Sequence, residues 1–293
     1  NYNRFRFGED NFHELMRHKV RRILLVSTFY DAFILEQDGH LAEQIRVDYR
    51  QLKLTAAPRI TTVPTADMAL EMVQKRSFDL VITLMRIGGM TPFAMADEIK
   101  KVRPNLPVVL LINVASDLAY IDKSSSDMAN IDDVFLWRGD SMLFLAMLKC
   151  LEDKINAPHD TLRGLVRVIL LVEDNIPDYS RFLPLLYTEV MKQTQLNISE
   201  ERHVASRTLR MRARPKVLLA HTYEQAWEIY ERYKDFLLCI ISDVEYPRNG
   251  EIDKQAGIEL IKNIRKEKKT LPACLQSTVH RYLEDAMRLG TSF

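Results

Sequence analysis

Short runs of consecutive apolar residues alternate with stretches of helical spacing along the first half of the chain. Continuous runs at 23–26 and 107–112 are typical of strands buried on both faces of a parallel sheet. Further strands are expected at 59–63, 78–84 and 134–137, and helices at 41–54, 65–75, 93–102 and 141–155. Because strands that alternate with helices favour a parallel sheet with two covered faces, this half is predicted to be one α/β module.

The second half repeats this pattern. Strands are expected at 168–172, 216–220, 237–242 and 273–277, and helices at 177–193, 222–234, 256–266 and 283–289. The two halves are therefore a diverged internal repeat. The polar stretch 156–163, which contains Pro158, interrupts the pattern and predicts a boundary between a first module (21–156) and a second module (164–293).

Two segments stand outside the repeat. Residues 1–20 are expected to form an arm whose short amphipathic helix, with Leu15 and Met16, packs against the first module. The basic stretch 193–214 is expected to protrude from the second module as an extended helix or loop.

Composition narrows the class of protein. The 293 residues are 47% hydrophobic and 28% charged, as in an ordinary globular protein. A net charge of +1 provides no field that would attract nucleic acid or an anionic membrane. No apolar run approaches the roughly 20 residues that cross a bilayer, and the polar N-terminus shows no signal peptide. Three cysteines without CxxC spacing indicate a reducing compartment, so a cytoplasmic location is expected.

Acidic and hydroxyl residues follow the predicted strands of the second half. Glu173 and Asp174 follow the first strand, Asp243 follows the third, and Ser277 ends the fourth. In a doubly wound sheet, ligands bind beyond the carboxyl ends of the strands, where the strand order reverses. These residues are therefore the candidates for a functional site.

This arrangement resembles the response-regulator receiver family. The resemblance implies two flavodoxin-like, doubly wound modules in tandem, with the phosphoacceptor at Asp243 and the switch residue at Ser277. It also implies that Glu173, Asp174, Asp243 and the backbone carbonyl of Glu245 bind Mg²⁺. The implied partners are a histidine kinase or other phosphodonor and a fused or separate output domain. Modules of this kind are regulatory, so no enzymatic activity is expected from them.

The chemistry of the residues agrees with this implication. Three carboxylates at one sheet edge repel one another and attract a hard divalent cation, and Mg²⁺ takes oxygen ligands. Asp243 could then attack phosphorus as a nucleophile while the cation neutralises the phosphoryl oxygens.

The second half departs from the family pattern at its end. The family has a Lys at the end of a fifth strand, whereas the sequence stops at 291–293, where that strand should begin. The second module is therefore expected to lack its last strand, its last helix and the Lys, and the open sheet edge would favour a homodimer.

The first half departs from the chemistry. Ser27 and Thr28 replace the acidic pair, and Leu84 occupies the phosphoacceptor position. Arg138 stands near the Lys position and is expected to be an ordinary exposed or paired Arg. Leucine cannot be phosphorylated and nothing there would bind Mg²⁺, so this half is predicted to be a pseudo-receiver, an interaction module.

A second resemblance concerns the whole region. The stretches 7–12, 30–36 and 209–216 look like the N-terminal regions of long bacterial proteins that carry a phosphoenolpyruvate-synthase-like, PEP/pyruvate-binding domain downstream. That resemblance implies that these modules control a downstream phosphotransferase-like domain.

The main alternative is non-enzymatic and non-signalling: both modules are scaffolds, and Asp243 is never phosphorylated. A hydrolase of the haloacid dehalogenase kind is disfavoured because Glu245 stands where its second Asp would be. A zinc site is disfavoured because His13 and His18 have no Cys or His partner nearby, and no Gly-rich nucleotide-binding loop occurs.

Overall fold

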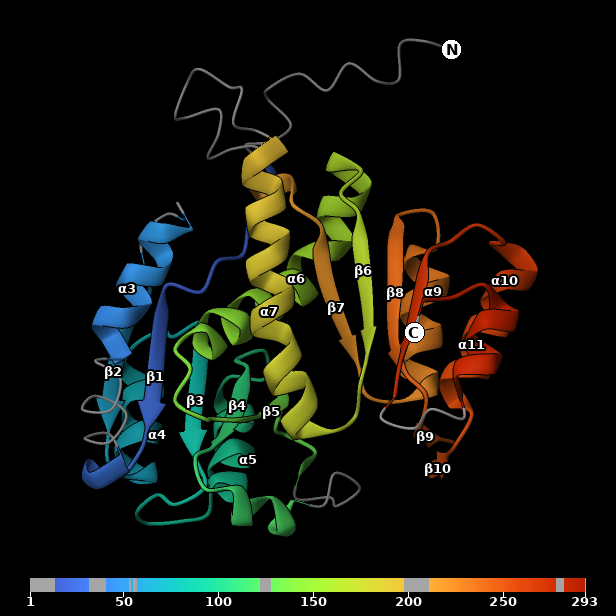
Figure 1. The fold of residues 1–293 in the computed structure, drawn as a ribbon. Coiled ribbons are helices and arrows are strands. Elements are labelled where there is room, and N and C mark those ends of the chain that lie inside the picture. The colour runs from blue at the N-terminus through green and yellow to red at the C-terminus, as the bar shows by residue number, and fades with distance from the viewer. Residues whose placement is uncertain are drawn as a thin grey trace. The chain divides into compact units, whose positions relative to one another are not determined.

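The computed structural model describes residues 14–31, 41–52, 54, 57–121, 128–197, 211–277 and 282–292 (Figure 1). By compactness the chain divides into two units. The first module consists of Lys19–Leu148 with Ser180–Pro184, and the second module consists of Asn1–His18, Lys149–Tyr179 and Leu185–Phe293.

The first module is built on a five-stranded parallel sheet. Its strands are β1 (Arg22–Val26), β2 (Arg59–Val63), β3 (Leu80–Leu84), β4 (Val108–Ile112) and β5 (Asp133–Leu136). They lie in the order β2-β1-β3-β4-β5, which is the flavodoxin-like order. The helices are α3 (Leu41–Gln51), α4 (Ala66–Lys75), α5 (Pro92–Val102) and the first part of α6 (Met142–Gly164), with a short 3-10 helix, η2 (Ala115–Tyr120). The predicted fold of this half is confirmed.

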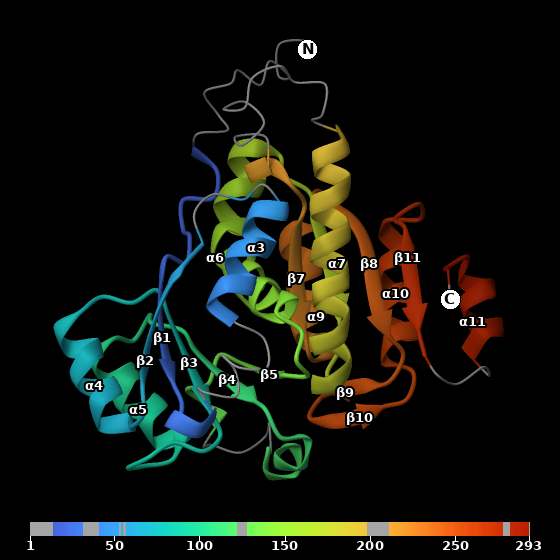
Figure 2. The same ribbon diagram turned by 60° about the vertical axis from the view of Figure 1, so that its left-hand side comes forward.

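The second module repeats this topology. The strands β6 (Val168–Val172), β7 (Lys216–Ala220), β8 (Leu237–Asp243) and β11 (Ala273–Gln276) pair in parallel in the order β7-β6-β8-β11. Its helices are α7 (Ile176–Asn197), α9 (Tyr223–Tyr233), α10 (Ala256–Glu267) and α11 (Leu283–Leu289). Helix α7 lies on one face of the sheet and α9 on the other (Figures 1 and 2). Ser292 forms a parallel bridge with Cys274 at the outer edge of β11, where a fifth strand is expected.

Local sequence signals explain where helices begin. The hydroxyl of Thr65 accepts a hydrogen bond from the Met68 amide at the start of α4, and that of Thr222 accepts one from the Gln225 amide at the start of α9. Each threonine oxygen stabilises the start of its helix, because it satisfies an amide that the first helical turn leaves without a partner. None of the helices in the described ranges is both long and apolar enough to cross a membrane.

The polar stretch 156–163 does not end a helix. Helix α6 continues through Pro158 as far as Gly164, and the division between the compact units falls at Lys149. Asn156 and Asp160 are buried because they bind polar groups that are distant in the sequence. The expected break is therefore wrong: these residues are polar because they make buried hydrogen bonds, and not because they face water.

A buried ion pair joins α6 to the segment before β7. Asp153 accepts two hydrogen bonds of 2.8 Å from the guanidinium of Arg214, and both side chains are almost fully buried. The same carboxylate accepts hydrogen bonds from the Tyr187 hydroxyl and the Val217 amide. Four donors thus compensate the cost of removing this charge from water.

The burial of Arg214 corrects part of the expectation for 193–214. Residues 193–197 are the end of α7, and a 3-10 turn, η4 (Met211–Ala213), precedes Arg214. The C-terminal end of this basic stretch therefore belongs to the core of the second module. The remaining residues, including Arg202, Arg207 and Arg210, lie outside the described residues.

The arm is also placed differently from the expectation. Its described part, 14–18, belongs to the second module and not to the first. Leu15 and Met16 are buried, and the Met16 amide donates to both carboxylate oxygens of Asp160 in α6, at 3.2 and 3.1 Å. The arm therefore binds Asp160 of α6, a residue that the sequence pattern assigned to the boundary stretch 156–163. Residues 1–13 lie outside the described part of the chain.

Replacing Asp153 with Ala should strongly destabilise the second module. The variant would leave the guanidinium of Arg214 buried without its counter-charge, which typically costs about 3–5 kcal/mol of unfolding free energy. Urea unfolding measures the effect. The matched control is Asp235→Ala, which removes an exposed partner of Lys268 and should change stability little. Equal effects of the two substitutions would contradict the structural role given to Asp153.

Candidate metal centre

Three carboxylates meet at the carboxyl edge of the second sheet. Glu173 and Asp174 directly follow β6, and Asp243 is the last residue of β8. The two strands are parallel neighbours, with Val172 in register with Ser242, and β7 lies on the other side of β6. This is the point where the strand order reverses, as the sequence predicted.

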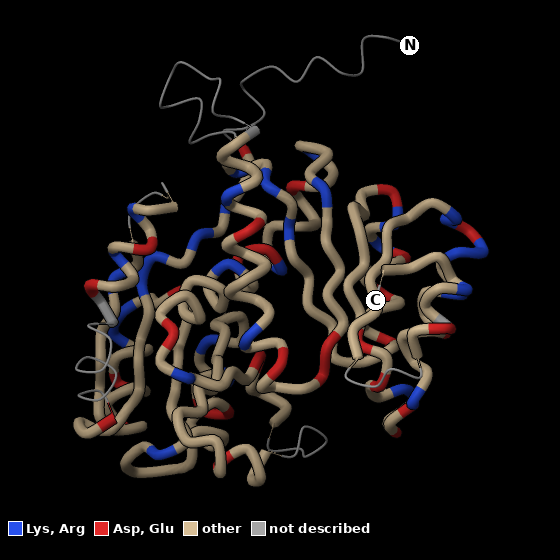
Figure 3. Tube along the Cα trace, viewed as in Figure 1, with Lys and Arg blue, Asp and Glu red and all other residues tan. Residues whose placement is uncertain are grey.

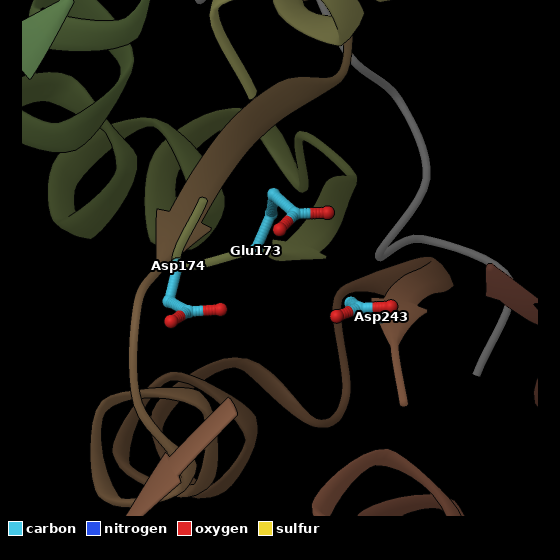
Figure 4. Close-up of side chains that lie close together, drawn as sticks. All are labelled: Glu173, Asp174 and Asp243. Carbon is cyan, nitrogen blue, oxygen red and sulfur yellow. The ribbon is translucent and has the colours of Figure 1, made fainter. Parts of the chain in front are cut away.

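The carboxylates face a common space (Figure 4). One oxygen from each of Glu173, Asp174 and Asp243 lies within 4.8 Å of the others. Among the described residues, this is the one group of three or more potential ligands that comes together in this way. The loop after β6 is acidic, whereas the amino-terminal ends of β6 and β7 are basic (Figure 3).

Hydrogen bonds to both main-chain and side-chain atoms hold Glu173 in place. Its amide donates to the carbonyl of Ala220 at the end of β7, and one of its carboxylate oxygens accepts the Asn175 amide at 3.1 Å. Its carbonyl oxygen lies 2.8 Å from Nδ1 of His221, which donates to it. These contacts fix a side chain that is 3% exposed, so its carboxylate is positioned before any ligand binds.

Asp243 is held by its neighbours in the loop and by α10. The amides of Val244 and Glu245 donate to its carboxylate. Gly257, near the start of α10, approaches so closely that a Cβ atom there would lie 2.1 Å from the Asp243 carbonyl oxygen. Only glycine permits this approach, and the Gly257 amide uses it to donate to the carbonyl of Val244.

The electrostatics of the site favour a cation. Burial raises the pKa of Asp243 from 3.8 to about 6, although the amides of Val244 and Glu245 oppose the shift. Burial, followed by the charge of Asp243, raises the pKa of Glu173 from 4.5 to about 8. Both shifts record the cost of crowding negative charge in a partly dehydrated space.

The remaining expected site residues lie on the adjoining loops. Ser277 follows β11, whose last residue, Gln276, is in register with Asp243. Glu245 directs its carboxylate to the hydroxyl of Tyr282, which donates to it at 2.7 Å. The role of Ser277 and the binding of a cation by the Glu245 carbonyl stay predictions.

Sequence reasoning missed a hairpin beside the site. The strands β9 (Tyr246–Arg248) and β10 (Glu251–Asp253) pair antiparallel, and Asn249 and Gly250 form the turn with φ of 53° and 85°. Asn-Gly between short strands is the strongest local signal for such a turn, so the pattern was available in the sequence. The Asn249 amide donates to Glu224 of α9, which anchors the hairpin to the module.

The first module has no comparable group among its described residues. Leu84 is fully buried at the end of β3. The hydroxyl of Thr28 donates to Asp31, and the side-chain amide of Asn113 donates to the other oxygen of the same carboxylate. The carboxylate of Asp31 is thus held by hydrogen bonds from two neutral side chains. Arg138 is exposed, as expected.

Comparison with known proteins gives structural neighbours only. No family model matches the sequence, and no curated protein matches it. A CheY-like receiver domain of a response regulator from Methanospirillum hungatei is 18% identical, covers 46% of this chain and 96% of its own, and gives a TM-score of 0.36. The N-terminal domain of a response regulator/sensory box/GGDEF protein from Carboxydothermus hydrogenoformans is 15% identical, with coverages of 47% and 98% and a TM-score of 0.36.

A third neighbour was solved with ligands. The response regulator TrrA from Thermotoga maritima, in complex with Mg²⁺ and BeF, is 20% identical, with coverages of 40% and 87% and a TM-score of 0.31. The fold of each module of this chain is assigned from its own strand order.

Replacing Asp243 with Asn should stabilise the apo protein at neutral pH. A carboxyl group whose folded pKa lies above its unfolded value destabilises the fold once it ionises, so the gain is absent below about pH 4 and complete above about pH 7. Because Asp243 is only partly buried, solvent screening limits the gain to about 1–2 kcal/mol. Thermal unfolding between pH 4 and 8 measures it. Asp235→Asn, a control that removes an exposed carboxylate paired with Lys268, should show no such gain, and a gain confined to acidic pH would refute the electrostatic account of Asp243.

Proposed function

We propose that the second module is a receiver that accepts a phosphoryl group on Asp243 in a Mg²⁺-dependent reaction, and that the first module is a pseudo-receiver used for interaction. The observation that supports this most is the meeting of three carboxylates from two adjacent strands at the switch point of a doubly wound sheet. The chain would then be a regulatory part of a two-component system, phosphorylated by a histidine kinase or another phosphodonor.

The donor set fits a magnesium ion. All the ligand atoms on offer are oxygens, and the pKa values of Glu173 and Asp243, which burial raises, support a role for a positive charge at the site. Glu173, Asp174, Asp243 and the backbone carbonyl of Glu245 would hold the ion. When bound, it would supply positive charge that neutralises the phosphoryl oxygens.

The protein's own groups perform the remaining steps. Ionised Asp243 donates an electron pair to phosphorus, and an aspartyl phosphate forms. The bond between phosphorus and the donor breaks, and the donor leaves with that electron pair. Ser277, which directly follows the residue in register with Asp243, is proposed to hydrogen-bond the phosphoryl group and move its loop.

The proposed output follows from the resemblance of 7–12, 30–36 and 209–216 to PEP-synthase-like proteins. We propose that the modules control a phosphotransferase-like domain. Leu84, which is buried at the position of the phosphoacceptor, supports the proposal that the first module is not itself phosphorylated.

Cation binding is the first test. In calorimetric titrations of the natural full-length protein, Mg²⁺ should bind, and its affinity should rise between pH 6 and 8. The sign follows from the raised pKa values, because the cation must displace protons from Asp243 and Glu173 at the lower pH. Asp174→Asn should weaken binding about tenfold or more. Asp253→Asn, a matched substitution on the β9–β10 hairpin, should leave binding unchanged.

Phosphorylation is the second test. Acetyl phosphate with Mg²⁺ should label the wild-type protein at Asp243, and Asp243→Asn should remove the label detected by mass spectrometry while Asp253→Asn keeps it. If Mg²⁺ binds but no label forms with saturating donor, the module is a non-phosphorylated scaffold. A label that persists in Asp243→Asn would place the phosphoacceptor elsewhere.

A further inference from the structure

The described part of the arm, 14–18, contacts Asn156, Asp160, Gly164 and Lys216 of the second module. These four residues are called the socket. The two main-chain anchors of the arm are the Met16 amide, which donates to Asp160, and His18. The His18 amide donates to the side-chain oxygen of Asn156 at 3.0 Å, and the side-chain nitrogen of Asn156 donates to the His18 carbonyl at 2.7 Å. These contacts recognise the backbone of an extended segment in one register.

A side-chain contact adds an apolar element. Leu15 is 1% exposed and packs against the C-terminal turn of α6. A Cβ atom on Gly164 would lie 2.8 Å from one methyl carbon of Leu15 and 2.9 Å from the other. The absence of a side chain at residue 164 therefore leaves room for the methyl groups of Leu15 in this position.

The floor of the socket is ionic. Nζ of Lys216, at the start of β7, lies 3.0 Å from Asp160, and neither residue is exposed. Lys216 also contacts Sδ of Met16 and the carbonyl oxygen of Arg212, and His159 contacts the other oxygen of Asp160. The arm thus covers an ion pair that water would solvate well if the arm left.

Three features favour release of the docked arm. Met16 adopts a φ of 54°, a left-handed conformation that is unfavourable for a residue with a side chain. The charges beneath it regain hydration on opening, which offsets part of the apolar burial that is lost at Leu15. The anchored segment is short, so it can open without unfolding the sheet.

We propose that residues 14–18 are a detachable strap, and that the socket formed by Asn156, Asp160, Gly164 and Lys216 is its binding site. The chain leaves the second module after His18 and returns to it at Lys149. With the strap docked, the segment that leaves the second module after His18 starts from a fixed point. With the strap released, neither Asn156 nor Asp160 holds that segment, and a factor that captures the arm would favour the released state.

The strap is tested by limited trypsin digestion of the full chain under native conditions. Cleavage after Arg17 reports release, because its side chain is exposed while the main chain on either side is anchored. Gly164→Ala should raise the initial rate of this cleavage about tenfold while leaving the urea unfolding midpoint unchanged or higher, since alanine favours helix. Leu15→Ala should also raise the rate.

The double variant decides whether the effect acts through the socket. On the Leu15→Ala background, Gly164→Ala should add no further increase, because the methyl groups that collide with the new Cβ are gone. Equal increases on both backgrounds, or unchanged cleavage in both single variants, would overturn the proposal. The proposal would also be overturned if the cleavage rate of the wild-type protein depended on urea as steeply as global unfolding does. Residues 14–18 would then be an integral part of the fold and not a strap.

Discussion

The parallel pairing of β6 with β8 is the constraint on which the candidate site depends. Because Val172 and Ser242 are in register, the residues that follow both strands emerge side by side at one edge of the sheet. The backbone ladder therefore brings Glu173 and Asp174 to Asp243 whether or not their charges favour it. The hydrogen bonds and the packing of the whole sheet outweigh the cost of burying these charges close together. That cost appears in the raised pKa values of Glu173 and Asp243, which arise first from burial and then from charge repulsion. A site that is strained in this way is suited to a ligand that supplies the missing positive charge.

The two modules show the same topology with different electrostatics. In the first module, Leu84 at the end of β3 is buried, and the carboxylate of Asp31 accepts hydrogen bonds from Thr28 and Asn113. In the second module, the equivalent edge brings three carboxylates together. The two sheets therefore share a strand order but differ in the side chains at this edge. The different roles proposed for the two halves rest on these few positions and not on any change in strand order.

The sequence predicted the strands well because fully buried parallel strands are continuous apolar runs, and no other element of this length has that pattern. It also predicted the acidic edge, since strand ends and topology suffice to place it. The prediction failed for polar residues that are buried because they bind polar groups distant in the sequence. Asn156 and Asp160 have the composition of a solvated linker, and their partners His18 and Met16 lie 138 and 144 residues away. No local pattern distinguishes such a residue from one that faces water. The hairpin at Asn249 and Gly250 is a different case. Its Asn-Gly turn signal is local and could have been recognised in the sequence.

The contact between Met16 and Lys216 joins residues that are 200 positions apart. During synthesis the arm leaves the ribosome before its socket does, because the socket is completed only after β7 emerges. At roughly 5–20 residues per second, this interval lasts about 10–40 s. The first module, which lies entirely between the two, can complete its sheet before most of the second module has been made. The nascent arm must therefore remain available, bound neither to that module nor to a second chain, until its own binding site exists.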